Sequence, residues 1–243
     1  MGVYIDYSDG DRTFQAYVAR PAGGDVAPAM LVIHTVRGQT DAERERADQW
    51  AAKGCVGIAI DVYGKGRAGA DPATNFTLMG ECLGDRAMLS RRLLAAVAFA
   101  KGLEGVDPAR IAAVGYCFGG LCALDIARSG ARDVAGVVSV HGIFHPNGLP
   151  PQPIATRILI CHGYSDPHAP PEAMVALAGE LTDAGADWQI HAYGHVKHGF
   201  ANQGYDAPER GVVYDAAADR RSRTAIDAFA AELFAGQARD APV

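Results

Sequence analysis

Gly115-Tyr116-Cys117-Phe118-Gly119-Gly120 is the stretch that best predicts the fold of this chain, because it matches the pattern G-x-S-x-G with cysteine in place of serine. An apolar run, residues 110–114, precedes it, and a helix-forming run, residues 121–127, follows and ends before Gly130. This order is typical of a strand, a tight turn and a helix. The sequence therefore predicts a nucleophilic thiol at the turn between a strand and a helix.

The residue types around the turn fit this interpretation. Side chains at Gly115 and Gly119 would collide with neighbouring backbone in so sharp a turn. Cys117 would then lie exposed at a helix N-terminus, where free N–H groups and the helix dipole favour a thiolate. The alternative is a buried structural cysteine in a glycine-rich turn, since free cysteines are often core residues. The strand-turn-helix setting favours the nucleophile.

Length and composition narrow the class of protein. A chain of 243 residues can bury a large core, and we expect one α/β domain over residues 1–243. No apolar stretch approaches the roughly 20 residues that cross a bilayer. The N-terminus, residues 1–6, has neither the basic nor the apolar region of a secretory signal. We therefore expect a soluble protein in the cytoplasm, without a membrane partner.

Charge and cysteine usage exclude further classes. The net charge is −6 with scattered Lys and Arg, which argues against a nucleic-acid surface. The basic cluster at residues 220–223 falls in a helical pattern and is interpreted as a solvated face. Five cysteines without C-x-x-C spacing indicate reduced thiols. We expect a small-molecule substrate and a monomer or small homo-oligomer.

The pattern along the chain alternates strands and helices. Continuous or alternating apolar runs predict strands over residues 13–18, 29–34, 56–61, 110–114, 134–140, 157–161 and 188–193. Helices are predicted from the capping box of Thr40 and Glu43 to Gly54, over residues 85–101 and 121–127, from Pro171 to Gly185, and over residues 214–234. Residues 64–80 are expected to form a surface excursion. The alternation implies a mainly parallel sheet with helices on both faces.

Two residues that follow predicted strands complete a catalytic group. Reactive groups of an open α/β sheet gather at the carboxyl ends of its strands. Asp166 follows the strand over residues 157–161, and His198 follows the strand over residues 188–193. With Cys117 first, the chain order is nucleophile, acid and histidine. His198 would take the thiol proton and return it to the leaving group, while Asp166 would hold the imidazole tautomer.

An oxyanion hole is expected beside the thiol. The backbone N–H of Phe118, directly after Cys117, would supply one donor. A second would come from the loop after the strand that ends near Ile33, and Val36 is the residue we expect to supply it.

Each assignment has an alternative. Asp166-Pro167 could simply open a turn. His195 competes with His198, which we prefer because Gly199-Phe200 fits a tight loop beneath a pocket. A metal site formed by His191, His195 and His198 is disfavoured, because these residues span a strand and a loop without a spaced carboxylate.

The remaining histidines and cysteines at strand ends and in apolar runs have simpler roles. We interpret three histidines as structural or pocket-lining and four cysteines as small core residues: His34, His141, His162, Cys55, Cys82, Cys122 and Cys161.

Nearly the whole chain resembles the dienelactone hydrolase family. The resemblance is carried by the cysteine elbow and by residues 61–64, 162–166, 193–200 and 214–222. It implies an α/β-hydrolase fold, with a mainly parallel central sheet covered on both faces and no large lid domain. It also implies a Cys-His-Asp triad at Cys117, His198 and Asp166, a carboxymethylenebutenolidase-like carboxylic ester hydrolase acting on a lactone or other small ester, and no cofactor or metal.

Two positions depart from that family's pattern. Thr35 stands where members that open dienelactones usually carry a Glu that pairs with the resting thiol, and Asn202 stands where they carry an Arg that grips the substrate carboxylate. Arg37 could supply a replacement cation. With Tyr116 and Phe200, these residues form the expected substrate pocket. The departures affect the substrate more than the type of reaction.

The sequence thus supports a leading hypothesis and two alternatives. The leading one is a cysteine-dependent hydrolase of a small ester or lactone. A thioesterase or general carboxylesterase would use the same triad. A catalytically weak scaffold that binds a small molecule or a partner is favoured by Thr35, because the usual acidic partner of the thiol is missing.

Overall fold

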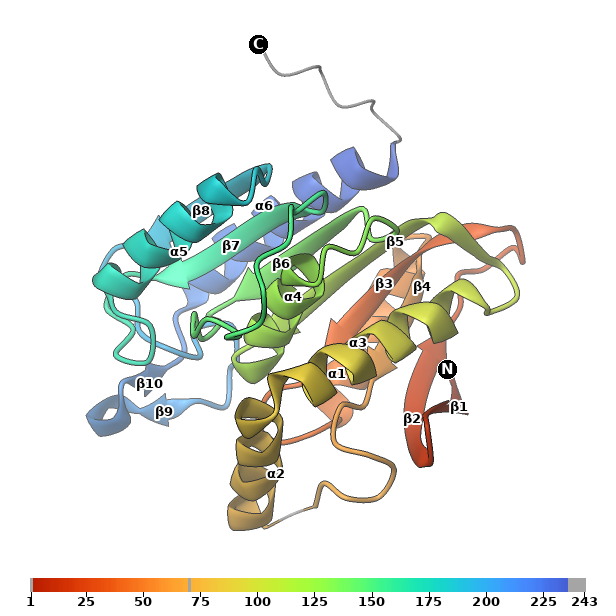
Figure 1. Cartoon of the computed structure of the whole chain (residues 1–243), viewed down its shortest axis with the longest axis horizontal. Coiled ribbons are helices and arrows are strands. Elements are labelled where there is room, and N and C mark those ends of the chain that lie inside the picture. The colour runs from red at the N-terminus through yellow and green to blue at the C-terminus, as the bar shows by residue number, and fades with distance from the viewer. Residues whose placement is uncertain (1, 70, 236–243) are drawn as a thin grey trace.

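The computed structural model describes residues 2–69 and 71–235, and within them an eight-stranded sheet forms the centre of the molecule (Figure 1). The strand order is β1-β2-β4-β3-β5-β6-β7-β8. The strands are β1 (Val3–Asp9), β2 (Arg12–Ala19), β3 (Ala27–Ile33), β4 (Val56–Ile60), β5 (Val106–Tyr116), β6 (Gly136–Val140), β7 (Arg157–Gly163) and β8 (Trp188–Tyr193). The β1–β2 and β2–β4 pairs are antiparallel, and all other pairs are parallel. The mainly parallel sheet predicted from the alternation of elements is confirmed.

Helices cover both faces of this sheet (Figure 1). The helices are α1 (Asp41–Ala52), α2 (Pro72–Gly84), α3 (Arg86–Lys101), α4 (Phe118–Arg128), α5 (Pro171–Asp183) and α6 (Ala216–Phe234). Along β3, Leu31 and Ile33 pack in a core with α3, α4 and α5, whereas Met30 and Val32 pack in a second core with α6. Successive strand residues point to opposite faces, so a fully buried strand must be apolar throughout.

Several helix boundaries follow from local chemistry. Thr40 and Glu43 make the predicted capping box, with the Glu43 carboxylate accepting from the Thr40 N–H at 2.8 Å. Pro171 occupies the first turn of α5, where a missing N–H costs no hydrogen bond. Asp215 caps α6 by accepting from the Ala218 N–H at 2.8 Å. These ends are set by residues adjacent in sequence, so the sequence predicts them well.

The prediction for residues 64–80 is wrong over its second half. Helix α2 begins at Pro72 with Asp71 as its N-cap, and buries Leu78 and Cys82 against the core; residue 70 lies outside the described residues. Asp followed by Pro is a helix-start signal, and here it overrides the glycine content. Strand β1 and the short strands β9 (Asp206–Ala207) and β10 (Val212–Val213), with a 3₁₀ turn between them (Pro208–Arg210), were not predicted either.

The loops that form the candidate site follow the carboxyl ends of β3, β4, β5, β6, β7 and β8. In the register of the parallel strands, the ends of β3 and β5 are paired at Ile33 and Gly115, and the ends of β7 and β8 at Gly163 and Tyr193. The residues beyond these positions therefore meet at one edge of the sheet. No helix in the described part of the chain is long and apolar enough to cross a membrane, and none forms a large lid over this edge.

Candidate active site

Cys117 stands at a strained turn between β5 and α4. Its backbone has φ 56° and ψ −116°, a conformation that residues with a Cβ rarely adopt. A Cβ on Gly115 would lie 1.8 Å from the Gly119 carbonyl oxygen, and a Cβ on Gly119 would lie 2.3 Å from the Ile33 carbonyl oxygen. The turn therefore requires both glycines, as expected. The Cys117 side chain remains partly exposed.

The backbone of Cys117 is held by His141, one of the three histidines interpreted from the sequence as structural or pocket-lining. The Cys117 N–H is shared between the Val140 carbonyl and His141 Nδ1, each at 3.1 Å. Burial lowers the pKa of His141, and the nearby charges of His198 and Arg46 lower it further. A neutral ring leaves Nδ1 free to accept. His141 has a positive φ of 39°, so the next strand end is strained as well.

Asp166 and His198 meet as predicted from the chain order. His198 Nδ1 lies 2.7 Å from Asp166 Oδ2, and both side chains are buried. The second carboxylate oxygen, Oδ1, accepts from the His168 N–H at 2.8 Å. The Asp166 carboxylate is thus held from two sides, with one oxygen directed at the imidazole.

His198 also interacts with Cys117. Burial of the ring opposes its charged form, but hydrogen bonds with Asp166 and Cys117, together with the charges of these two groups, raise the pKa of His198 to about 10. The surroundings of His198 therefore favour the protonated form of its ring. The structure thus brings Cys117, His198 and Asp166 together from three different loops.

Close packing keeps the two loops that carry Asp166 and His198 in register. The Ser165 N–H donates to the Val196 carbonyl at 2.9 Å, and a Cβ on Gly163 would lie 2.6 Å from the same carbonyl oxygen. The His198 backbone pairs with the β9–β10 segment, donating to Gly211 and accepting from Val213, each at 3.0 Å. His195 is exposed and has a positive φ of 62°, so it turns the loop rather than joining this group.

The two donors expected to form the oxyanion hole are backbone N–H groups. Within residues 2–69 and 71–235, neither the Phe118 N–H nor the Val36 N–H has a hydrogen-bond acceptor. Cys117 is the N-cap of α4 but gives no side-chain cap, so the first N–H groups of that helix stay free. The Phe118 ring is fully buried and stacks on Tyr63, with 5.8 Å between ring centroids.

Three residues beside the thiol form what we call the rim: Thr35, Arg37 and Tyr205. Thr35 is buried, and its hydroxyl accepts from the Arg37 N–H at 3.2 Å and is hydrogen bonded to Tyr205. Burial and the charge of Cys117 raise the pKa of Tyr205, while the Thr35 hydrogen bond and the charge of Arg37 oppose this. Tyr205 was not predicted, because nothing in the sequence between Phe200 and Tyr214 marks it.

The other three residues of the expected pocket lie elsewhere. Tyr116 lies beneath the Arg46 guanidinium, 3.9 Å from its ring centroid. With Asn202 it lines a cavity of about 600 Å³ between α1 and α6 that includes no member of the Cys117, His198 and Asp166 group. Phe200 is fully buried, and its ring lies edge-to-face with the rings of His141 and Tyr193.

The alternation of side chains along β5 explains the position of Tyr116. Tyr116 lies on the same face of the sheet as Val114, the face covered by α6.

The remaining thiols are core residues. Cys55, Cys82, Cys122 and Cys161 are free and buried. Burial raises the pKa of Cys82 to about 11 and that of Cys161 to about 12, and it also raises the pKa of Cys55 and Cys122. Such thiols are poor nucleophiles. In the described residues, no group of three or more His, Cys, Asp or Glu side chains is placed to hold a metal ion.

Comparison with known proteins agrees with this architecture. A solved structure named m3DLH is 34% identical and superposes with a TM-score of 0.88, over 96% of this chain and 98% of its own. A dienelactone hydrolase-like promiscuous phosphotriesterase from metagenomic libraries is 30% identical, with a TM-score of 0.86 over the same shares. A protein of Aquifex aeolicus, provisionally named a carboxymethylenebutenolidase, is 25% identical over 88% of this chain and 91% of its own. The model of the dienelactone hydrolase family matches residues 14–234. This chain belongs to the dienelactone hydrolase family, a family of hydrolases with the α/β-hydrolase fold.

Proposed function

We propose that this protein hydrolyses a small ester or lactone by nucleophilic attack of the Cys117 thiolate, with His198 and Asp166 as its partners. The observation that carries the proposal is the 2.7 Å contact between His198 and Asp166, on a ring that also interacts with Cys117. A thiolate next to an imidazolium is the activated form of a cysteine nucleophile. Membership of the dienelactone hydrolase family supports the same reaction.

The proposed reaction has two halves. The Cys117 sulfur attacks the ester carbonyl carbon, and the oxygen of the tetrahedral intermediate accepts from the Phe118 and Val36 N–H groups. The carbon–oxygen bond to the leaving alkoxide then breaks, and the proton on His198 passes to that oxygen. His198 then takes a proton from water, the hydroxide attacks the thioester, and the carbon–sulfur bond breaks to release the carboxylic acid and restore the Cys117 thiolate next to protonated His198.

The rim supports a broader substrate range than a dienelactone. Thr35 offers a neutral hydroxyl group where the family pattern has a carboxylate, Tyr205 adds a second neutral hydroxyl, and Arg37 is the exposed cation next to them. Neutral hydroxyls discriminate less strongly among acyl groups than a buried charge does. We therefore include thioesters and aryl esters among the proposed substrates, and a phosphotriester because one structural neighbour is named for that activity.

The decisive experiment compares Cys117→Ala with Cys117→Ser on a panel of one aryl ester, one lactone, one thioester and one aryl phosphotriester. Loss of all hydrolysis in Cys117→Ala, with an unchanged melting temperature, is the expected result. The serine variant should keep weak activity at best, because an alkoxide is harder to form beside the same imidazole. Near-normal turnover by Cys117→Ala would refute the proposal.

A weakly catalytic binding scaffold is the other function with a specific observation behind it, namely Thr35 in place of an acidic residue. Alkylation by iodoacetamide separates the two readings, because it requires a thiolate but no ester substrate. Rapid alkylation confined to Cys117 near neutral pH supports the enzyme. Alkylation as slow as that of a free thiol, with no turnover on the panel, supports the scaffold.

A further inference from the structure

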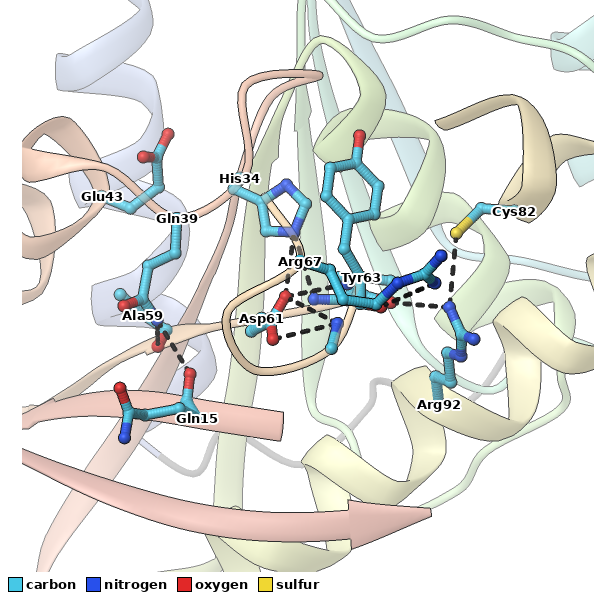
Figure 2. A network of polar contacts seen from close by, with 12 residues as sticks. Gln15, His34, Gln39, Glu43, Ala59, Asp61, Tyr63, Arg67, Cys82 and Arg92 are labelled. Atoms are coloured by element: carbon cyan, nitrogen blue, oxygen red, sulfur yellow. Dashed lines mark hydrogen bonds and ion pairs between the residues drawn. The ribbon is translucent and has the colours of Figure 1, made fainter. Parts of the chain in front are cut away.

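His34 lies fully buried between two loops at the edge of the sheet. Its ring follows β3 and is directed toward the Asp61–Gly64 loop, with the Tyr63 ring beside it (Figure 2). Nδ1 lies 2.7 Å from the Thr35 carbonyl oxygen, and Nε2 lies 3.1 Å from the Val62 N–H. Both ring nitrogens therefore have backbone partners.

These two partners fix which nitrogen carries the proton. The Val62 N–H can only donate, so Nε2 must accept, and the proton is on Nδ1. Nδ1–H then donates to the Thr35 carbonyl. The Asp61 carboxylate sets the loop that presents Val62, because it accepts from the N–H groups of Tyr63 at 2.8 Å and Gly64 at 3.0 Å. The loop after β4 thus determines which tautomer His34 adopts.

The Thr35 carbonyl belongs to the same peptide plane as the Val36 N–H. In a trans peptide the C=O and the N–H point in opposite directions, and the plane is rigid. Residues 2–69 and 71–235 include no cis peptide bond. A donor that holds the Thr35 oxygen on the buried side therefore holds the Val36 hydrogen on the opposite side.

We infer that His34 is the positioning residue of the oxyanion hole, because it fixes the direction of the Val36 N–H through the Thr35 carbonyl. This inference rests on the proposed function, in which that N–H stabilises the tetrahedral intermediate. His34 acts through the backbone and does not touch the substrate.

His34 also contacts the residue that supplies the other donor. Its ring centroid lies 6.1 Å from that of Phe118 and 4.6 Å from that of Tyr63. A Cβ on Gly119 would lie 2.7 Å from the His34 carbonyl oxygen, so the elbow and the His34 backbone are in direct contact. One buried residue therefore joins the two halves of the hole.

Two further hydrogen bonds also hold this part of the backbone, so the loss of activity expected from changing His34 alone is limited. The Gly38 N–H donates to the same Thr35 oxygen at the longer distance of 3.2 Å. The Tyr63 hydroxyl donates to the Val36 carbonyl at 3.1 Å, which holds the next peptide plane. Without His34 the Thr35–Val36 plane keeps one weaker anchor, so the loss should be smaller than that of a missing donor.

The test uses two amide variants that each keep one of the two hydrogen bonds. In His34→Asn the side-chain NH₂ can take the place of Nδ1–H and donate to Thr35, but the Val62 N–H loses its acceptor. In His34→Gln the longer side chain can place its carbonyl near Nε2 and accept from Val62, but the donor to Thr35 is lost. Each variant leaves one buried backbone group unpaired, so both should melt at similarly lowered temperatures.

The expected result is a difference in kcat between the two variants. His34→Gln should lower kcat on an aryl ester by about tenfold to ~10²-fold, below the ~10²–10³-fold of a removed donor, and leave KM nearly unchanged. His34→Asn should stay within about fivefold of the parent enzyme, the size of one ordinary hydrogen bond. Alkylation of Cys117 by iodoacetamide, which forms no oxyanion, should proceed at the parent rate in both.

Two outcomes would overturn the inference. One is an equal loss of kcat in both variants, and the other is a parallel slowing of alkylation, because each would indicate a general disturbance of the site. The proposed function fails separately. If Cys117→Ala still hydrolyses the ester, the cysteine mechanism is wrong, whereas an inactive Cys117→Ala with equally active His34 variants removes only the role of His34.

Discussion

The elbow at Gly115–Gly120 and the rim of Thr35, Arg37 and Tyr205 both adjoin Cys117, yet they are held in different ways. The elbow is fixed by backbone contacts so close that a single methyl group at Gly115 or Gly119 has no room. The rim is held by hydroxyl hydrogen bonds and ends in an exposed arginine. The elbow can change only by rearranging the sheet edge, whereas each rim residue can change alone.

This difference suggests a division of roles, in which the elbow supports the reaction and the rim selects the substrate. A strained nucleophile at a helix start, with free N–H groups beside it, serves any acyl transfer. The hydroxyl and guanidinium groups of the rim are instead proposed to contact particular parts of a substrate. Changes in the elbow should therefore alter kcat or folding, and changes in the rim should alter KM for selected substrates.

The largest effect is expected from Gly119→Ala. The added methyl group would lie 2.3 Å from the Ile33 carbonyl oxygen, which forces the elbow away from β3 and displaces the Phe118 N–H. We expect a loss of about 3 kcal/mol or more in the free energy of unfolding. Hydrolysis should be undetectable, as measured by urea denaturation and aryl ester turnover.

Gly179→Ala is the matched control for that variant. Gly179 lies inside α5, and a Cβ there would meet no atom within 4 Å. Alanine is the better helix former, so this variant should gain up to about 1 kcal/mol and keep full activity. Similar behaviour of the two variants would contradict the idea that the elbow is fixed by steric contact.

The next largest effect is expected from Asp166→Asn, which removes the buried carboxylate of the proposed triad. Removing the carboxylate should lower kcat by roughly 10²–10⁴-fold, because the imidazole loses its orienting charge. The hydrogen bond and charge of Asp166 both raise the pKa of His198, so their loss lowers that pKa from about 10. The alkaline limb of the kcat/KM profile should therefore move to lower pH.

The same pair makes folding stability depend on pH. The pKa of His198 is raised in the folded state, so its contribution to stability is complete below the unfolded value of roughly 6.5 and disappears as pH rises through about 10. Urea denaturation between these values should show this decline in the parent protein and a weaker one in Asp166→Asn. An identical slope in both proteins would argue that Asp166 does not control the protonation of His198.

A moderate effect is expected from Tyr205→Phe in the rim. The ring stays, and only the hydroxyl bonded to Thr35 is lost, which amounts to about 1 kcal/mol or a fivefold change. KM should rise by about that factor for substrates that reach the hydroxyl, while kcat stays within about twofold. A fall in kcat with unchanged KM would place Tyr205 in the chemical step.

The smallest effect is expected from Arg37→Ala. Arg37 is exposed, so water and salt screen its charge. KM should rise only a few-fold, at low salt, for esters that carry a carboxylate, and stay constant for neutral esters. Arg132→Ala is the control, because Arg132 is also exposed and lies before β6, at the opposite edge of the sheet. Equal effects of the two variants on the acidic ester would remove Arg37 from the rim.

The sequence by itself determined the features that depend on neighbouring residues. The elbow, the capping box at Thr40 and the order of Cys117, Asp166 and His198 are local patterns or follow from strand ends, and the structure contains each arrangement. The Asp71-Pro72 start of α2 carried a similar signal, although the glycines around it hid the helix.

Tertiary structure alone decided which distant side chains meet at the thiol. His34 and His141 gained their contacts because loops after β4 and β6 converge on the elbow, and Tyr205 gained its contact with Thr35 because the β9–β10 segment folds back over His198. Tyr116 and Asn202 lie on the α6 side instead. Such contacts depend on strand register and on which face a side chain takes, and a one-residue shift reverses that face.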